Sequence, residues 1–329
     1  PTMTKQSVTR QMRRFAFRFF SAVVSTVAVL TILTLGAKVA YSSIVQYRAD
    51  KWEATLRRDA GGLREGFRSY TVGQGRTAIL MVHGFGSSPG VFQNVASALA
   101  ERGYTCRAMC LPGYGLSAHE FAKAGRAQWL AAINDEVARL SADYDHVWLL
   151  GHSMGASLAI DYVSGGSRAV DGVVLLAPLI QVSNKRSPIL AARTYYELGR
   201  HVFAPDELVE SAFSPDFHTN EPVANQDNVP FTPFAVFGQV FDIMDSIGRH
   251  PAGLTIPTLM VLADDDKVVD SRAAERYFSQ VGAARKDLMH VAHSGHIVPL
   301  DNGWEHVVER VDSFVRGVEP SVTASAGQP

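Results

Sequence analysis

The stretch 147–160 (VWLLGHSMGASLAI) constrains the fold of this chain more than any other. Apolar residues suited to a buried strand lead directly into the pattern Gly-X-Ser-X-Gly, and small residues with helical spacing follow. A strand-turn-helix of this kind holds the serine hydroxyl at the apex of a sharp turn, because Gly151 and Gly155 have no Cβ atoms where strand and helix crowd together. Ser153 is therefore the candidate nucleophile. Such pentapeptides also occur by chance, so the hypothesis depends on partners elsewhere in the chain.

A serine nucleophile needs a base to remove its proton, and the base needs a carboxylate that fixes its tautomer. Three histidines compete for the role of base near the strand predicted at 287–291. His290 lies within that strand and His293 lies close to its end. His296 follows Ser-Gly in the loop beyond, so we predict that His296 is the base.

Three consecutive carboxylates, Asp264, Asp265 and Asp266, follow the strand predicted at 257–263. A loop of this kind can offer only one carboxylate to the histidine without repulsion between like charges. We favour Asp266, which lies at the turn before a helix expected to begin near Ser271. Asp265 is the alternative, and the remaining carboxylates are expected to be solvated.

Acyl transfer also needs hydrogen-bond donors aimed at the oxyanion of the tetrahedral intermediate, each worth about 3–4 kcal/mol. Two backbone N–H groups are candidates. One belongs to Met154, directly after the nucleophile, and the other to Phe85 in the loop that follows the apolar run at 77–82. Gly84 and Gly86 flank Phe85 and allow its backbone to approach closely.

Apolar strands alternate with helical stretches along most of the chain, which predicts an α/β fold with a mostly parallel, doubly wound sheet. Strands are predicted at 67–72, 77–82, 104–111, 147–150, 172–177, 257–263 and 287–291, and helices at 92–102 and 121–140. The stretch 179–254 interrupts this alternation, so we predict an inserted helical cap there. Its aromatic residues either line an apolar pocket over the nucleophile or form the cap's own core: Tyr195, Tyr196, Phe203, Phe213, Phe217, Phe231, Phe234, Phe237 and Phe241.

The uncharged apolar run at 19–37 predicts a transmembrane helix. At ~1.5 Å per residue it spans ~28 Å, close to the ~30 Å hydrocarbon core of a bilayer. A cleaved signal peptide is the alternative, but the apolar core of a signal peptide is usually only about 7–15 residues long. Length therefore favours a single-pass anchor. Lys and Arg flank both ends almost equally; we expect the N-terminus inside, which for a bacterial inner-membrane protein places the following domain in the periplasm.

Charge is unevenly distributed along the chain, although the formal net charge is only −1. Residues 1–58 hold ten Lys or Arg and two acidic residues, whereas 59–329 hold 21 basic and 30 acidic residues. The acidic main domain disfavours a nucleic-acid partner. Cys106 and Cys110 lie in one predicted strand, ~13 Å apart and beyond disulfide reach. Neither cysteines nor histidines have a metal-binding spacing, so we expect no metal and no cofactor.

These patterns divide the chain into four parts. We predict a basic segment with the anchor at 1–45, a charged linker helix at 46–61, the main domain at 62–316 with its cap at about 179–254, and a disordered tail rich in Ser, Ala, Gly and Pro at 317–329.

With these features the chain resembles the α/β-hydrolase superfamily, and within it the bacterial carboxylesterase and monoacylglycerol lipase branch. The resemblance spans about residues 77–316 and rests on five motifs: HGFGSSP at 83–89, LPGYG at 111–115, GHSMG at 151–155, DKVV at 266–269 and SGH at 294–296. The order Ser, Asp, His along the chain is that of the superfamily. The N-terminal anchor departs from soluble members, as does Asp270, where many relatives have proline.

The resemblance implies a membrane-tethered serine hydrolase that cleaves carboxylic esters with an apolar acyl chain, so its substrate is a small-molecule or lipid ester. In that reaction Ser153 attacks, His296 transfers the proton and Asp266 orients the histidine. Aminopeptidase-like or thioesterase activity on the same residues is the alternative. Glu197 and Glu207 of the cap are the candidate carboxylates for binding the amine of a peptide substrate. A non-catalytic binding protein on this fold is disfavoured because all three side chains are present.

Overall fold

The computed structural model describes residues 5–317 except 167–169, 188, 212–213 and 220–228, with side chains from residue 12 onward. The chain divides into two compact units, Pro1–Ala54 and Thr55–Pro329. The tail predicted at 317–329 lies outside the described residues apart from Gly317.

The first unit is built on one long helix, α1 (Lys5–Glu53). Its part from residue 12 onward is apolar enough to cross a membrane, with a mean hydropathy of 2.1 in its best window. Polar side chains within the apolar run bond to the helix itself: the hydroxyls of Thr31 and Thr34 donate to the carbonyl oxygens of Val27 and Leu30, each at 2.8 Å. The helix thus satisfies its own polar groups, as an apolar solvent would require.

The structure differs from the prediction of a separate linker helix over 46–61. Helix α1 continues through the first part of that range and ends at Glu53. The chain then turns, because the carboxylate of Asp59 accepts hydrogen bonds from the N–H groups of Gly61 (2.9 Å) and Leu63 (3.0 Å). Such side-chain bonds compete with helical ones and favour a turn.

The second unit is organised around a seven-stranded sheet with the order β1-β3-β2-β4-β5-β8-β9. All neighbouring strands are parallel except β1, which pairs antiparallel with β3 at the edge. This confirms the predicted fold class. The strands are β1 (Tyr70–Val72), β2 (Thr77–Val82), β3 (Tyr104–Met109), β4 (His146–His152), β5 (Gly172–Leu176), β8 (Thr258–Ala263) and β9 (Lys286–Val291).

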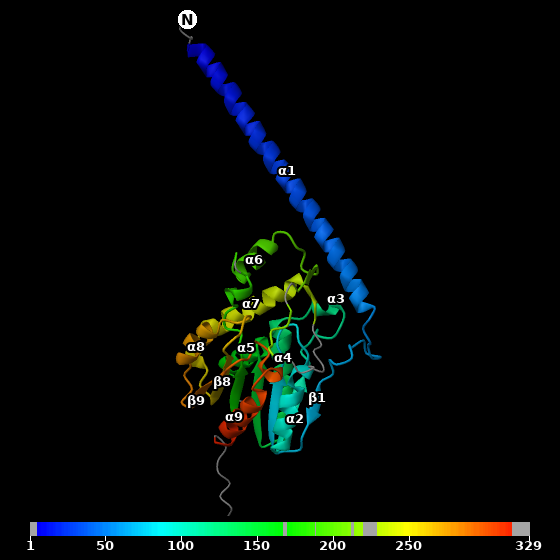
Figure 1. The fold of residues 1–329 in the computed structure, drawn as a ribbon, viewed down its shortest axis with the longest axis vertical. Coiled ribbons are helices and arrows are strands. Elements are labelled where there is room, and N and C mark those ends of the chain that lie inside the picture. The colour runs from blue at the N-terminus through cyan, green and yellow to red at the C-terminus, as the bar shows by residue number, and fades with distance from the viewer. Residues whose placement is uncertain (1–4, 167–169, 188, 212–213, 220–228, 318–329) are drawn as a thin grey trace, which may run out of the picture. The chain divides into compact units, whose positions relative to one another are not determined.

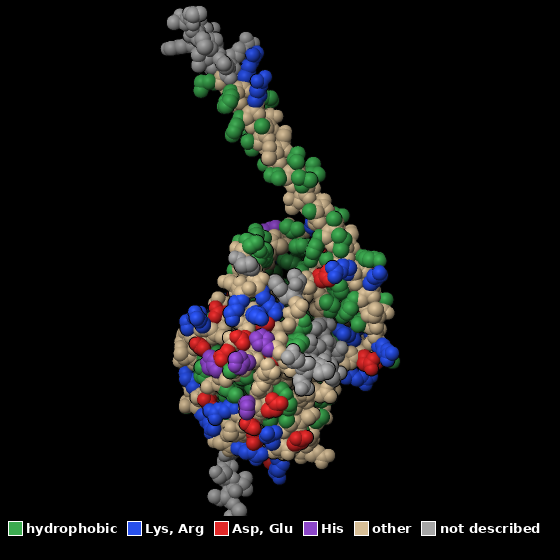
Figure 2. All heavy atoms as spheres, in the orientation of Figure 1, with side chains coloured by type: hydrophobic (Ala, Val, Ile, Leu, Met, Phe, Trp, Pro, Cys, Tyr) green, Lys and Arg blue, Asp and Glu red, His purple; other side chains and the backbone are tan. Residues whose placement is uncertain are grey.

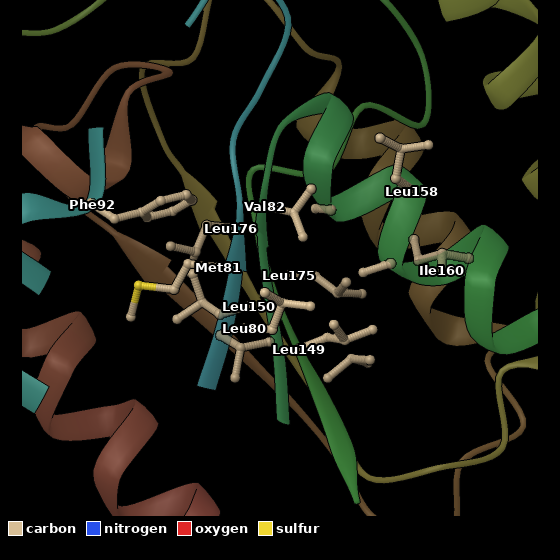
Figure 3. Close-up of a cluster of buried hydrophobic side chains, with 14 of the residues drawn as sticks. Leu80, Met81, Val82, Phe92, Leu149, Leu150, Leu158, Ile160, Leu175 and Leu176 are labelled. Carbon is tan, nitrogen blue, oxygen red and sulfur yellow. The ribbon is translucent and has the colours of Figure 1, made fainter. Parts of the chain in front are cut away.

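Helices cover both faces of the sheet (Figure 1). They are α2 (Gln93–Glu101), α3 (Ala118–Phe121), α4 (Arg126–Asp143), α5 (Met154–Ser164), α8 (Ser271–Ser279) and α9 (Trp304–Arg316), with short 3-10 turns η1 (Pro89–Phe92) and η4 (Val298–Leu300). Figure 3 shows Met81 and Phe92 on one side of the central strands, and Leu158 and Ile160 of α5 on the other. Strands buried on both faces explain why their sequences are continuous apolar runs.

One predicted helix, at 121–140, begins later than expected. Gly125 is extended, with φ −165°, and separates α3 from α4. The N–H of Arg126, at the start of α4, donates to the side-chain oxygen of Gln239 at 3.0 Å. A Cβ on Gly125 would lie 2.4 Å from that same oxygen, so a larger residue here would have to displace the side chain of Gln239.

The cap is inserted between β5 and β8. It contains η2 (Asn184–Arg186), α6 (Ala192–Gly199), β6 (Leu208–Glu210), β7 (Phe231–Pro233), α7 (Phe234–Gly248) and η3 (Pro251–Gly253). The two short strands form an antiparallel pair that the helical prediction did not include. Its aromatic rings pack on one another, with centroids of Tyr196 and Phe234 5.4 Å apart and of Phe203 and Phe234 5.5 Å apart. These rings form a core for the cap; Phe213 lies outside the described residues.

Candidate active site

Ser153 occupies the sharp turn between β4 and α5. Its backbone has φ 54° and ψ −119°, a conformation that L-residues rarely adopt. Two glycines make the turn possible. A Cβ on Gly151 would lie 2.4 Å from the Cα of Ala156, and a Cβ on Gly155 would lie 2.0 Å from the carbonyl oxygen of Val82. The strained turn lifts the serine side chain beyond the end of β4.

Two hydrogen bonds connect Ser153, His296 and Asp266. The Oγ–H of Ser153 donates to Nε2 of His296 at 2.8 Å. The Nδ1–H of His296 donates to Oδ2 of Asp266, also at 2.8 Å. This arrangement requires the neutral imidazole with its proton on Nδ1, so that Nε2 is free to accept a proton. The structure thus brings together three side chains that the sequence analysis selected from different loops.

Asp266 is fully buried, and its second oxygen is occupied as well. Oδ1 accepts hydrogen bonds from the N–H groups of Val268 (2.7 Å) and Val269 (2.8 Å). Burial alone would raise the pKa of Asp266, but the electrostatic attraction and hydrogen bond of His296, together with the two backbone hydrogen bonds, outweigh it and hold the pKa below its ordinary value. The carboxylate therefore stays ionised, as is needed to stabilise an imidazolium.

The competing residues face elsewhere. The half-exposed carboxylate of Asp264 lies 3.0 Å from Nδ1 of His290, and that of Asp265 lies 3.6 Å from Nδ1 of His218. His293 has φ 55° in the turn after β9. Of the three adjacent carboxylates, Asp266 is the one that contacts His296.

The two candidate oxyanion donors come from loops beside Ser153. Met154 is the first residue of α5, where a backbone N–H has no acceptor within the helix. The loop that carries Phe85 runs against Ser153, since a Cβ on Gly84 would lie only 3.0 Å from the Cβ of that serine. The Phe85 ring packs on Phe237 of the cap, with centroids 5.3 Å apart.

Two buried histidines, His83 and His152, bond to the backbone of loops around Ser153, and the sequence did not predict either role. His83 donates from Nδ1 to the carbonyl of Gly84 (3.0 Å) and accepts at Nε2 from the N–H of Leu111 (3.1 Å). Burial lowers its pKa to about 4. His152 donates from Nε2 to the carbonyl of His296 (2.9 Å). Burial and the charge of His296 lower its pKa to about 3, so both rings are neutral at neutral pH.

Two buried carboxylates outside the predicted set, Asp216 and Asp301, also contact the loop of His296. Nothing in the local sequence marks them as part of the site, because they reach the loop of His296 through its backbone N–H groups. Asp216 lies 80 positions before His296.

A family model for serine aminopeptidases of the S33 type matches residues 73–302, most of the chain. The chain belongs to this family. It is 24% identical to a thermostable monoacylglycerol lipase of Bacillus sp. (strain H-257), over 76% of this chain and 94% of that enzyme. It is 21% identical to a carboxylesterase of Bacillus subtilis, over 77% of this chain and 97% of that enzyme. Together these matches identify the chain as a serine hydrolase of the esterase and lipase type.

Solved structures agree on the fold of this family member. The monoacylglycerol lipase of Paleococcus ferrophilus superposes with a TM-score of 0.66 at 18% identity, covering 76% of this chain and 98% of that structure. The family match begins at residue 73, so α1 lies before the matched region.

Proposed function

We propose that this hydrolase cleaves carboxylic esters with an apolar acyl chain through an acyl-enzyme on Ser153. The observation that carries the proposal is the pair of 2.8 Å hydrogen bonds that link Ser153 to His296 and His296 to Asp266. Together with an ionised, buried carboxylate, this is the arrangement that activates a serine hydroxyl for attack on a carbonyl.

The reaction follows from the geometry. His296 Nε2 takes the proton of Ser153 as Oγ attacks the ester carbonyl, and the N–H groups of Phe85 and Met154 receive the developing oxyanion. The tetrahedral intermediate collapses, His296 returns the proton to the departing alkoxide, and the acyl group stays on Ser153. A water molecule, deprotonated by His296, then attacks the acyl carbonyl. The second intermediate collapses by breaking the bond to Oγ, His296 returns the proton to Ser153, and the carboxylic acid leaves.

The preference for an apolar acyl chain rests on the cap and on the relatives. Apolar side chains gather on the cap surface around α6 (Figure 2), among them Ile189, Leu190, Tyr195, Leu198 and Val202. Relatives of this chain act on monoacylglycerols and carboxylic esters, as their names state.

Aminopeptidase activity, which the family description names, has less support in the cap. An amine-binding site would need a free carboxylate near the nucleophile. The carboxylate of Glu197 pairs with Arg200 at 3.0 Å, and that of Glu207 accepts from the N–H of Ala204 at 3.0 Å. Both carboxylates are thus engaged by neighbours in the chain.

The test is a substrate panel with the full chain in detergent: p-nitrophenyl esters of increasing acyl length, monoacylglycerols, acyl thioesters and aminoacyl amides. We expect the highest kcat/KM on esters, rising with acyl length. Faster turnover of aminoacyl amides than of any ester would replace the proposal with peptidase activity.

We further propose that α1 is an uncleaved membrane anchor with its N-terminus on the cytoplasmic side. The support is the length of the uncharged run and the exposure of its side chains: Val27, Leu30, Ile32 and Leu33 are all more than half exposed. An apolar surface of this extent needs an apolar environment.

A further inference from the structure

A buried carboxylate of the cap reaches the backbone of both loops that carry Asp266 and His296. Asp216 lies in the cap segment 214–219, between β6 and β7, and is 5% exposed. Its Oδ2 atom accepts hydrogen bonds from the N–H of Lys267 (2.8 Å) and from the N–H of His296 (3.2 Å). One oxygen atom therefore joins the residue after the candidate acid to the candidate base itself.

The other oxygen of Asp216 is neutralised by cations from two directions. Arg186 of η2 forms an ion pair with Oδ1 at 3.0 Å, and the ammonium group of Lys267 lies 4.0 Å from the same atom. A buried carboxylate without such partners would be costly to desolvate. The ion pair keeps Oδ1 occupied and leaves Oδ2 aimed at the two backbone N–H groups.

A second buried carboxylate, that of Asp301, joins the loop of His296 to the cap segment. Oδ1 of Asp301 accepts from the N–H groups of His218 and Thr219 in the cap segment, both at 2.8 Å, while Oδ2 accepts from the N–H of Gly295 at 2.6 Å. The backbones lie in close contact, since a Cβ on Gly295 would be 2.8 Å from the carbonyl oxygen of Asp216. Hydrogen bonds to a buried carboxylate on each side thus join the cap segment to the histidine loop.

We propose that Asp216 is a positioning residue for proton transfer, acting through the backbone of His296 and Lys267. The inference rests on the proposed function of Ser153 and His296. Asp266 fixes one end of the imidazole through Nδ1, but the ring can reach Ser153 only if the loop of Asp266 and the loop of His296 keep their separation. Oδ2 of Asp216 sets that separation by bonding to both. Misplacement of a catalytic group by about 1 Å can cost on the order of 100-fold in rate.

The experiment compares Asp216→Ala with Asp216→Asn in the full chain, in detergent, on the best ester of the panel. Alanine removes both accepted hydrogen bonds, so we expect kcat to fall about 10- to 100-fold with KM within about threefold of the wild-type value. The carbonyl oxygen of asparagine replaces Oδ2 and keeps both bonds, while its NH2 group no longer accepts from Arg186. We therefore expect Asp216→Asn to retain several-fold more of the wild-type kcat than Asp216→Ala. The downfield proton resonance of the His296 Nδ1–H should weaken or move in the alanine variant and persist in the asparagine variant.

The matched control is Asp161→Ala. Asp161 is equally buried, at 6% exposed, and bonds to Arg126 at 2.6 Å and to Ser246 at 2.8 Å, away from the histidine loop. Its loss should lower thermal stability without changing kcat of the folded protein or the histidine resonance. If Asp216→Ala does not fold, Asp216→Ser, whose short hydroxyl leaves both N–H groups unbonded, takes its place.

Three outcomes are distinguishable. Wild-type protein without esterase activity contradicts the proposed function. Active wild-type protein with full kcat in Asp216→Ala overturns the positioning role. An asparagine variant as impaired as the alanine variant overturns the backbone mechanism and assigns the effect to the carboxylate charge.

Discussion

Gly155, in the first turn of α5, lies so close to Val82 at the end of β2 that a Cβ on the glycine would be 2.0 Å from the valine carbonyl oxygen. This contact fixes how far the first turn of α5 can move from the central strands. Because Ser153 precedes that turn, the strained conformation of this candidate nucleophile depends on a backbone-to-backbone contact with no room for a side chain.

Gly155→Ala should therefore destabilise the protein. Overpacking a well-filled site typically costs about 1–3 kcal/mol, and a clash with backbone cannot be relieved by a rotamer change, so we expect the upper end of that range or more. Gly248→Ala is the control, because a Cβ there meets nothing within 4 Å. Denaturant midpoints in detergent measure both variants; equal midpoints would show that the turn can open.

Ser153→Ala and His296→Ala should each lower kcat about 10⁴-fold or more, since the members of such a hydrogen-bonded set act as a unit. A fluorophosphonate probe should label wild-type protein on Ser153 and leave Ser153→Ala unlabelled. Peptide mapping of the labelled protein identifies the residue that carries the probe. A loss of less than tenfold for His296→Ala would reassign the base.

The three adjacent carboxylates should differ sharply. Asp266→Asn should lower kcat by about 10⁴-fold, because the amide no longer fixes the tautomer of His296. Asp264→Asn and Asp265→Asn are matched controls that remove a charge from the same loop, and we expect kcat within threefold of wild type. If Asp265→Asn is the most impaired of the three, the acid has been misassigned.

Acid should destabilise the fold through His83 and His152. Their folded pKa values, about 4 and about 3, lie below the ordinary value of about 6.5, so the unfolded chain binds protons that the folded chain does not. The stability from neutral burial is complete above about pH 6.5 and is lost as pH falls towards 4 and 3. For His83 the loss is on the order of 3 kcal/mol.

The measurement is the free energy of unfolding between pH 4 and 7. His83→Gln should reduce the slope with pH, whatever its stability at pH 7. His306→Gln, which removes a largely exposed ring, is the control for losing a histidine. An unchanged slope in His83→Gln would mean that the pKa of His83 is the same in the folded and the unfolded protein.

The anchor proposal predicts that the full chain stays with membranes through alkaline carbonate washing. A variant lacking residues 1–45 should be released and keep most of its kcat on soluble short-chain esters, because the residues of the site lie in the second unit. Its activity should drop mainly on substrates presented in a bilayer, where tethering raises the local concentration. Mature protein with a new N-terminus near Lys38 would show a cleaved signal peptide instead.

Local patterns were sufficient to predict the sheet. The run at 77–82 coincides with β2 because both faces of that strand are covered, so every residue after Thr77 is apolar. The same applies to β8, predicted one residue longer than it is. The short strands β6 and β7 have no such pattern. Each is only three residues long, too short to show a periodic pattern of apolar residues, and they form by pairing with each other within the cap.

The candidate site could be predicted only where a residue belongs to a recognisable motif at the end of a strand. Ser153, His296 and Asp266 were selected from motifs at strand ends, and the structure brings them together. Asp216 and His83 act on backbone atoms of distant segments, and a residue whose partners are N–H or C=O groups leaves no mark on the sequence of those partners. Such roles become visible only when the fold is known.

Caps of this kind are inserted at one point of the sheet, between β5 and β8, which invites the idea that they can be exchanged as independent modules to alter substrate range. In this enzyme the cap is not independent of the sheet domain, because Asp216 of the cap bonds to the histidine loop and Asp301 bonds back to the cap. A foreign cap would bring a new acyl pocket but would arrive without the acceptor for the His296 backbone. A chimera with a foreign cap would therefore have to carry Asp216 across the junction to keep this contact with the histidine loop.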